Sequence, residues 1–187
     1  PTAEEVTSSF ARLASGGIVA VVRAGGAALK GGTTAIPVGR VHYEGVGIVG
    51  TSSTDIDQAY QRSRRCELKE KGALWVAGAG GAMGHMHILR ALQTSSGPMT
   101  VVATNRGSER LQQLRHTFEP IAEREGKRFI AFSPTESKAS TVERLRSETS
   151  NAFFDDVVVV AAQGALMTEA FDAVGPGGMI SLFAGLP

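Results

Sequence analysis

The chain has 187 residues and a formal net charge of +1, and 42% of its residues are hydrophobic and 20% charged. These values are ordinary for a globular domain, and so small a charge supplies no field that would attract nucleic acid or an acidic membrane. The single cysteine, Cys66, rules out an internal disulfide and any zinc site built from several thiolates of this chain. We therefore expect neither a nucleic-acid nor a membrane partner, and a reducing, cytoplasmic setting.

The first 72 residues predict, in order, a helix, a strand, an extended loop, a strand and a helix. The loop (24–39) contains two Gly-Gly pairs, and residues 40–51 are expected to be extended. The segment FARLASGGIVAVV (10–22) resembles FDAVGPGGMISLF (171–183), because both place two glycines between a helix end and a strand. We therefore expect residues 1–72 to be the tail of a preceding α/β unit, packed on the same sheet as the strands that follow, and the chain to be a fragment of a longer protein. The alternative is that helix, Gly-Gly and strand form a common unit of α/β proteins.

From residue 73 onward, buried strands alternate with helices. The apolar runs predict strands at 73–78, 99–105, 128–134, 155–162 and 177–185. The segments between them predict helices at 84–93, 108–126, 140–148 and 164–175. Such alternation is typical of a parallel sheet with helices on both faces. The expected fold class is therefore α/β, a Rossmann-type doubly wound parallel sheet, with residues 73–187 forming a dinucleotide-binding domain truncated at its C-terminal end.

Three local features refine these expectations. Pro120 should kink the second of these helices or start a new one, because proline removes a helical N–H. Ser140 and Glu143 have the spacing of a capping box and predict a helix start. Asp155 and Asp156, where the fourth strand begins, are expected to form a turn.

The segment LWVAGAGGAMGHMHILRAL (74–92) passes from a strand through a glycine cluster into a helix. Glycine lets a diphosphate approach the backbone, and the start of a helix offers free N–H groups and the positive end of a dipole. The expected diphosphate site is the turn formed by Gly78, Gly80, Gly81, Ala82, Met83 and Gly84. The glycines at 78, 80 and 84 give GxGxxxG, one residue longer than the usual fingerprint, whereas counting from Ala79 restores the period as A-x-G-x-x-G. The alternative is a glycine turn that holds no ligand.

The end of the second strand indicates which dinucleotide would bind. NAD-binding units place Asp or Glu about 20 residues beyond the glycines to hold the ribose hydroxyls. Here that position is Asn105, followed by Arg106 and, four residues later, Arg110. Because arginine can pair bidentately with a phosphate, this pattern favours NADP over NAD. The alternative is that the two arginines are solvated charges at the start of a helix.

The fourth strand ends in Ala161 and Ala162, whose small side chains would let an adenine or ribose lie against the strand end; plain packing is the alternative. His85 and His87 are two residues apart on a predicted helix and therefore point to different sides. We find no pattern that predicts a catalytic residue or a metal ligand in this chain.

Four segments together carry a family resemblance: ALWVAGAGGAMGHMHILRAL, FDDVVVVAA, GPGGMISLFAGLP and RVHYEGVGIVGTSSTDI. They resemble the nucleotide-binding part of zinc-type medium-chain alcohol dehydrogenases, and look closest to the L-sorbose-1-phosphate-reductase-like branch. The resemblance implies a Rossmann domain that binds NAD(P)(H) in an oxidoreductase acting on a polyol or sugar phosphate, possible homo-oligomer formation, and a diphosphate held by the four glycines. It also implies a catalytic zinc on a separate domain, to which nothing in this chain corresponds, so we expect the fragment alone to be inactive.

Two other functions fit the same pattern. The first is a non-catalytic nucleotide-sensing or structural Rossmann domain of a tandem protein, which the lengthened glycine spacing favours. The second is a nucleotide-sugar or methyl-donor enzyme on the same fold; a methyl-donor site usually has a carboxylate where this chain has Asn105.

Overall fold

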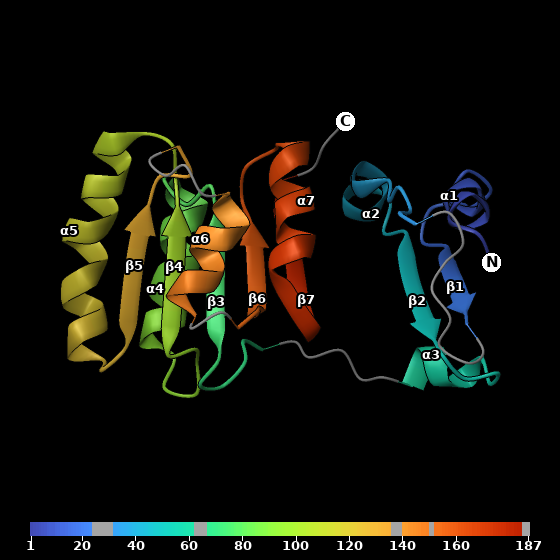
Figure 1. Ribbon diagram of the computed structural model, residues 1–187, viewed down its shortest axis with the longest axis horizontal. Helices are drawn as coiled ribbons and strands as arrows, with labels where there is room; N and C mark the ends of the chain where they lie inside the picture. The colour runs from blue at the N-terminus through green and yellow to red at the C-terminus, as the bar shows by residue number, and fades with distance from the viewer. Residues whose placement is uncertain (24–31, 62–66, 136–139, 150–151, 185–187) are drawn as a thin grey trace. The chain divides into compact units, whose positions relative to one another are not determined.

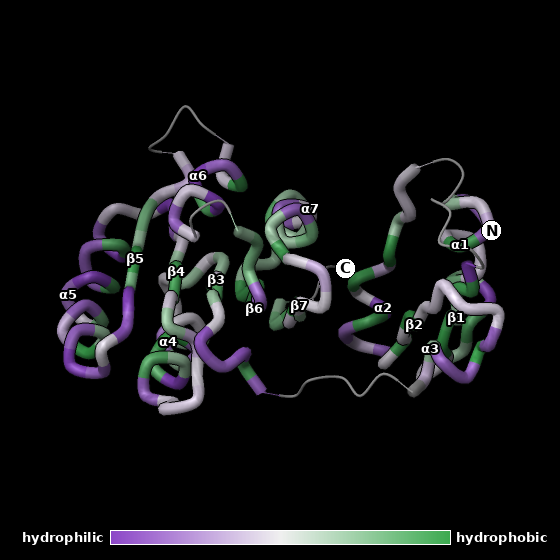
Figure 2. The backbone as a smooth tube through the Cα atoms, turned by 60° about the horizontal axis from the view of Figure 1, so that its bottom comes forward, coloured by the Kyte–Doolittle hydropathy of each residue, from purple (hydrophilic) through white to green (hydrophobic). Residues whose placement is uncertain are grey.

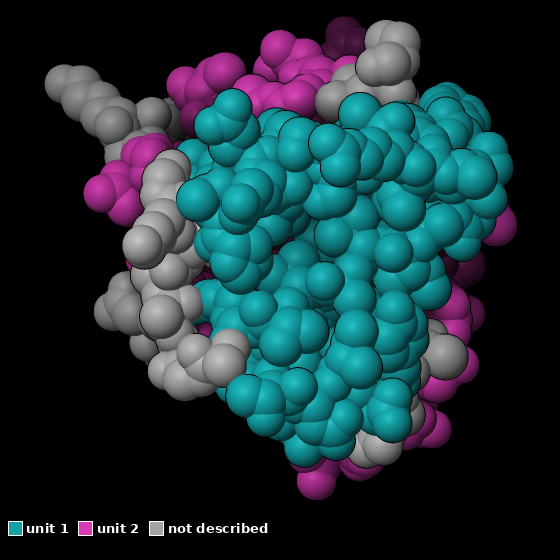
Figure 3. Space-filling view, turned by 90° about the vertical axis from the view of Figure 1, so that its right-hand side faces the viewer, with its two compact units in different colours: residues 1–64, 185–187 teal, residues 65–184 magenta. Residues whose placement is uncertain are grey.

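The computed structural model describes residues 1–23, 32–61, 67–135, 140–149 and 152–184. The chain divides into two compact units, one of Pro1–Arg64 with Gly185–Pro187 and one of Arg65–Ala184, which are coloured separately in Figure 3. No helix in the described ranges combines the length and the apolar character that crossing a bilayer requires.

In its described residues, the first unit has two parallel strands and three helices (Figure 1). The elements are α1 (Ala3–Phe10), β1 (Ile18–Val22), α2 (Val38–Tyr43), β2 (Gly47–Thr51) and α3 (Asp57–Gln61). Strands β1 and β2 pair in parallel, from Ile18 opposite Gly47 to Val22 opposite Thr51. The expectation that residues 1–72 share a sheet with the later strands stays a prediction.

The prediction of an extended segment at 40–51 is wrong in its first part, because α2 occupies Val38–Tyr43. The side chain of Arg40 explains this helix. Its guanidinium donates to the carbonyl oxygens of Phe10 and Leu13 and pairs with the Glu44 carboxylate at 2.8 Å. These bonds satisfy the carbonyl group of the last residue of α1 and that of a residue three positions beyond it, and they hold α2 against α1. Most of the expected loop before α2, residues 24–31, lies outside the described residues.

The second unit is a five-stranded parallel sheet with helices on both faces. Its elements are β3 (Ala73–Ala77), α4 (Ala82–Gln93), β4 (Thr100–Thr104), α5 (Ser108–Arg124), β5 (Arg128–Phe132), α6 (Thr141–Glu148), β6 (Phe154–Val159), α7 (Gly164–Ala173) and β7 (Val174–Leu182). The strand order is β5-β4-β3-β6-β7. Figures 1 and 2 show α4 and α5 on one face of the sheet and α6 and α7 on the other. The predicted α/β doubly wound fold is confirmed.

The sheet is the core of this unit, and the tube of β3 and β4 is mostly apolar in Figure 2. Leu74, Trp75 and Val76 of β3 are fully buried. The buried indole Nε1 of Trp75 donates to Thr104 Oγ1 at 3.0 Å, which ties β3 to β4 and leaves no polar atom of the ring unsatisfied. Hydrophobic burial on both faces accounts for the near-continuous apolar runs in the sequence.

Three further predictions concern a capping box, the effect of Pro120 and the start of the fifth strand. The capping box is confirmed, because the Ser140 hydroxyl accepts from the Glu143 N–H and the Glu143 carboxylate accepts from the Ser140 N–H. Pro120 does not start a new helix; α5 runs through it from Ser108 to Arg124. The fifth strand of the unit begins at Val174, earlier than predicted.

The expected turn at Asp155 and Asp156 is wrong, because both residues lie within β6. One oxygen of Asp156, which is 1% exposed, accepts from the Lys69 N–H at 2.7 Å, and one of Asp155 accepts from the Ala73 N–H at 2.9 Å. The two carboxylates hold the segment that leads into β3.

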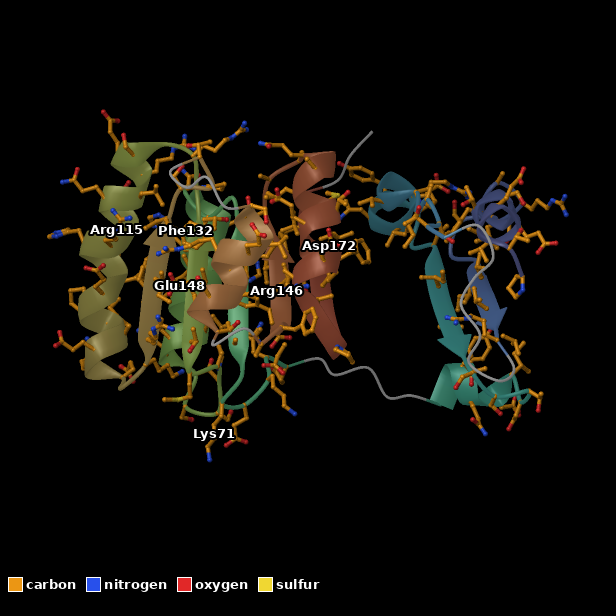
Figure 4. All side chains as sticks on the ribbon, in the orientation of Figure 1. Lys71, Arg115, Phe132, Arg146, Glu148 and Asp172 are labelled. Atoms are coloured by element: carbon orange, nitrogen blue, oxygen red, sulfur yellow. The ribbon has the colours of Figure 1, made fainter. Side chains whose placement is uncertain are left out.

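Side chains of α6 join this helix to α7 and to β5; Arg146, Glu148 and Asp172 are labelled in Figure 4. Arg146 of α6 donates to the carbonyl oxygen of Asp172 in α7 at 3.1 Å. Glu148 accepts from Arg128 of β5 at 2.8 Å and pairs with Arg144 at 2.7 Å. These contacts secure the helix that precedes β6 and so support the strand that ends at the candidate site.

Candidate functional site

The glycine turn between β3 and α4 is fastened to the ends of two neighbouring strands. The N–H groups of Gly78 and Ala79 both donate to the Thr104 carbonyl at the end of β4, at 3.0 and 2.9 Å. Gly78 has φ +81°, and a Cβ on it would stand 2.6 Å from the Cβ of Ala161, just beyond β6. Glycine at 78 is therefore needed for both its conformation and its packing. The strand order reverses between β3 and β6, which is where open α/β sheets form ligand crevices.

The other three glycines of the turn have different surroundings. A Cβ on Gly84 would lie 2.2 Å from the Ala79 carbonyl oxygen, so this buried residue lets α4 pack directly on the turn. A Cβ on Gly80 would lie 2.6 Å from Asn105 Oδ1 and 2.7 Å from Arg110 Cδ. A Cβ on Gly81 would have no atom within 4 Å. The open side of the turn is therefore at Gly81.

Three helices of the second unit begin without a side-chain cap. The residues that precede α4, α5 and α7 are Gly81, Gly107 and Gln163, and none of these three accepts a hydrogen bond from its helix through a side chain. By contrast, α6 is capped by Ser140. The first four N–H groups of a helix have no partner within the helix, and they carry the positive end of its dipole. Uncapped helix starts therefore leave donors available to an anion.

These three helix starts line one cleft at the carboxyl ends of β3, β4 and β6. The cleft has a volume of about 550 Å³. Its lining consists of Gly78, Gly81, Thr104, Asn105, Arg106, Gly107, Arg110, Pro134, Val160, Ala161, Gln163, Ala165, Leu166 and Glu169. Within the described part of the chain, neither Arg106 nor Arg110 has an ion-pair partner. Among the described residues, the cleft therefore combines two cations without an ion-pair partner, three helix N-termini and one carboxylate, that of Glu169.

The structure gathers six of the expected site residues in this cleft: Gly78, Gly81, Asn105, Arg106, Arg110 and Ala161. The other five expected residues are outside its lining. Of these, Gly80 and Gly84 pack against neighbouring atoms of the turn, and Ala82, Met83 and Ala162 are exposed elsewhere. The predicted site residues did not include Gly107, Gln163 and Glu169, which also line the cleft. The first two immediately precede predicted helices, which is a usable signal, whereas nothing near Glu169 in the sequence marks it.

The two histidines of α4 lie apart from the cleft and from each other. The His85 ring meets the Phe118 ring edge-on at 5.3 Å between centroids, and the His87 ring meets that of Phe183 at 4.7 Å. Burial, and secondarily the positive charge of Arg90, lower the pKa of His87. Among the residues that the structure describes, no three His, Cys, Asp or Glu side chains gather in a way that could hold a metal ion.

The sequence matches no protein-family model and no curated protein. Three similar solved structures are all dehydrogenases. A zinc-dependent alcohol dehydrogenase 2 from Streptococcus pneumonia is 13% identical with a TM-score of 0.50, and the match covers 64% of this chain and 31% of that one. The alcohol dehydrogenase TADH from Thermus sp. ATN1 is 28% identical with a TM-score of 0.48, over the same shares of the two chains.

The third is a glucose dehydrogenase from Haloferax mediterranei, 16% identical with a TM-score of 0.48, matched over 71% of this chain and 33% of that one. This chain therefore spans about a third of the length of the structures that it matches. The likeness to the streptococcal enzyme establishes a shared α/β fold.

Proposed function

We propose that the second unit binds a nicotinamide dinucleotide in its cleft and is the dinucleotide-binding part of a hydride-transferring oxidoreductase. The observation that carries this proposal is the convergence of three uncapped helix starts on one cleft at the point where the strand order reverses. A diphosphate is the ligand group that such N–H donors and dipoles suit. The cleft volume of about 550 Å³ is also within the range of roughly 300–1,000 Å³ that is usual for small-molecule and cofactor sites.

In this proposal each part of the cleft has a role. The open backbone at Gly81 receives the diphosphate, since a ligand can approach it without meeting a side chain. Gly78 and Ala161 keep the floor of the cleft free of large side chains, because their close packing leaves no room for a Cβ on residue 78. Asn105 and Arg106 lie beside the adenosine ribose, at the end of β4.

We favour NADP over NAD as the preferred cofactor. A carboxylate at the end of β4 would hold the free ribose hydroxyls of NAD, but Asn105 occupies that position, and Arg106 and Arg110 also line the cleft. Both guanidinium groups are free of ion pairs within the described residues and can therefore bind the 2′-phosphate of NADP. The nicotinamide supplies the hydride chemistry, and this chain binds and orients it.

The proposed parent enzyme is a zinc-type medium-chain dehydrogenase that acts on an alcohol, polyol or sugar phosphate. The sequence resemblance and the fold shared with a zinc-dependent alcohol dehydrogenase support this assignment. The described residues gather no donor set for zinc. We infer that the isolated chain binds the cofactor but transfers little or no hydride.

Fluorescence titration with NADPH and NADH tests the binding proposal. We expect saturable binding of both, with NADPH the tighter ligand, because only NADPH can engage the two arginines through a 2′-phosphate. Absence of saturable binding to either cofactor would contradict the proposal.

A second function is a nucleotide sensor without catalysis, favoured by the lack of a zinc donor set among the described residues. The two functions differ in the full-length protein. A dehydrogenase oxidises an alcohol as NADP+ or NAD+ takes up the hydride, or reduces the matching carbonyl compound as NADPH or NADH gives it up. A sensor binds the cofactor with the same residues and leaves the absorbance at 340 nm unchanged.

A further inference from the structure

Gly80 and Gly81 are neighbours in the glycine turn but have different surroundings. Gly80 does not line the cleft. The space that a side chain at position 80 would occupy is filled by two other side chains, one from the end of β4 and one from the start of α5. Asn105 Oδ1 lies 2.6 Å, and Arg110 Cδ 2.7 Å, from the place that a Cβ on residue 80 would occupy. Real Cβ atoms essentially never have neighbours this close, so any side chain at 80 would displace Asn105, Arg110 or both.

We propose that Gly80 is a positioning residue that sets the preference between NADPH and NADH by letting the side chains of Asn105 and Arg110 lie over the glycine turn. The proposal rests on the proposed dinucleotide function and deepens it. It gives Gly80 a different task from close approach of the diphosphate, which the usual fingerprint would assign to it. That approach remains open at Gly81, where a Cβ would meet nothing within 4 Å.

The contacts of the two side chains support this role. Asn105 Nδ2 donates to the Gly107 carbonyl at 3.4 Å, so the amide spans from the turn to the residue that precedes α5. Arg110 belongs to the first turn of α5, and its stem rests at Gly80 while its guanidinium has no ion pair in the described residues. Both residues also line the cleft. A stem that is held at the turn restricts where the guanidinium can reach, which lowers the entropy lost when it binds a phosphate.

The test compares Gly80→Ala with the matched control Gly81→Ala. The same methyl group is added at neighbouring positions, but only the first meets Asn105 and Arg110. Each variant is titrated with NADPH and with NADH, and its folding is checked by circular dichroism and urea unfolding. We expect Gly80→Ala to reduce the ratio of NADPH to NADH affinity at least five-fold. Gly81→Ala, whose methyl group faces the cleft, should weaken both cofactors by the same factor and leave the ratio unchanged.

A double-mutant cycle shows whether Gly80 acts through Arg110. In an Arg110→Ala background, Gly80→Ala should change the ratio of affinities less than it does in the wild type, because only Asn105 is left for the methyl group to displace. A general structural effect of the added methyl group would persist in that background. If Gly80→Ala does not fold, Arg110→Ala and Asn105→Ala test the proposal instead, since these substitutions only remove atoms. Each should lower the ratio of NADPH to NADH affinity.

The outcomes separate this inference from the proposed function. A wild-type chain that binds neither cofactor contradicts the proposed function, and the inference with it. A wild-type chain that binds both cofactors equally overturns the inference and the proposed NADP preference but leaves the proposed dinucleotide binding intact. A folded Gly80→Ala variant with the wild-type ratio overturns only the inference. Unchanged ratios in both Arg110→Ala and Asn105→Ala overturn it as well.

Discussion

Gly78 and Ala161 meet across the point where the strand order of the sheet reverses, so closely that a Cβ on Gly78 would stand 2.6 Å from the Cβ of Ala161. The two residues follow β3 and β6, the strands on either side of the reversal. Their contact brings the glycine turn against the end of β6, and both residues line the cleft. The floor of the candidate site therefore requires that residue 78 carry no Cβ.

Gly78→Ala should destabilise the second unit by about 2–5 kcal/mol, the sum of a left-handed backbone cost and an overpacking cost. Gly126→Ala is the matched control, because Gly126 also has a positive φ, +63°, but a Cβ there meets nothing within 4 Å. It should cost only about 1–2 kcal/mol. Urea unfolding of both variants measures the difference, and equal losses would show that the Gly78–Ala161 contact contributes nothing.

Arg106→Ala should weaken NADPH binding about 10–100-fold, the loss expected for one charge-assisted hydrogen bond to a phosphate of about 1.5–3 kcal/mol. NADH has no 2′-phosphate, so its affinity should change less than three-fold. Arg124→Ala, at the far end of α5, removes the same charge from a residue outside the cleft and should change neither affinity. Isothermal titration calorimetry provides the comparison, and an equal loss for NADPH and NADH would remove the 2′-phosphate role from Arg106.

The half-buried imidazole of His87 should make stability depend on pH. Its pKa lies below the usual value of 6.5 in the folded chain, because burial disfavours the charged ring and Arg90 repels it. The unfolded chain takes up the proton at a higher pH than the folded chain does. The stability that the neutral ring contributes is therefore present above about pH 6.5 and is lost as the pH falls through the lowered pKa.

His87→Phe keeps a ring against Phe183 and removes the titrating group. We expect the melting temperature of this variant to fall less between pH 7.5 and pH 5.5 than that of the wild type. His116→Phe, at an exposed position, should keep the wild-type dependence. The same pH dependence in the wild type and in His87→Phe would mean that other groups cause it.

Local sequence patterns were sufficient to predict the second unit. Alternating apolar runs and helical periods predict the strand and helix order, and the glycine cluster predicts the turn at 78–81, because these signals lie within a few residues of one another. The position of Asn105 and Arg106 beside that turn also follows, since the ends of neighbouring parallel strands share one edge of a sheet.

Contacts between distant segments could not be predicted in this way. Helix α2 is held by bonds from Arg40 to carbonyl groups 30 and 27 residues away, and Asp156 accepts from a backbone N–H 87 residues away. The side chains that lean over Gly80 are another example, because the glycine fingerprint describes the backbone and says nothing of what fills the space beside it. Glu169 enters the cleft only through the packing of α7.

The most direct test of cofactor binding at the start of α4 is Gly81→Asp, measured for stability and for NADPH affinity in the same preparation. Gly81 has an extended backbone, with φ −107° and ψ 176°, which aspartate adopts readily. An aspartate there would cap an uncapped helix, so the free energy of unfolding should stay the same or rise by up to about 1 kcal/mol. The same carboxylate would occupy the donors and repel a diphosphate, so NADPH affinity should fall at least 100-fold. A folded Gly81→Asp chain that binds NADPH as tightly as the wild type would contradict the account.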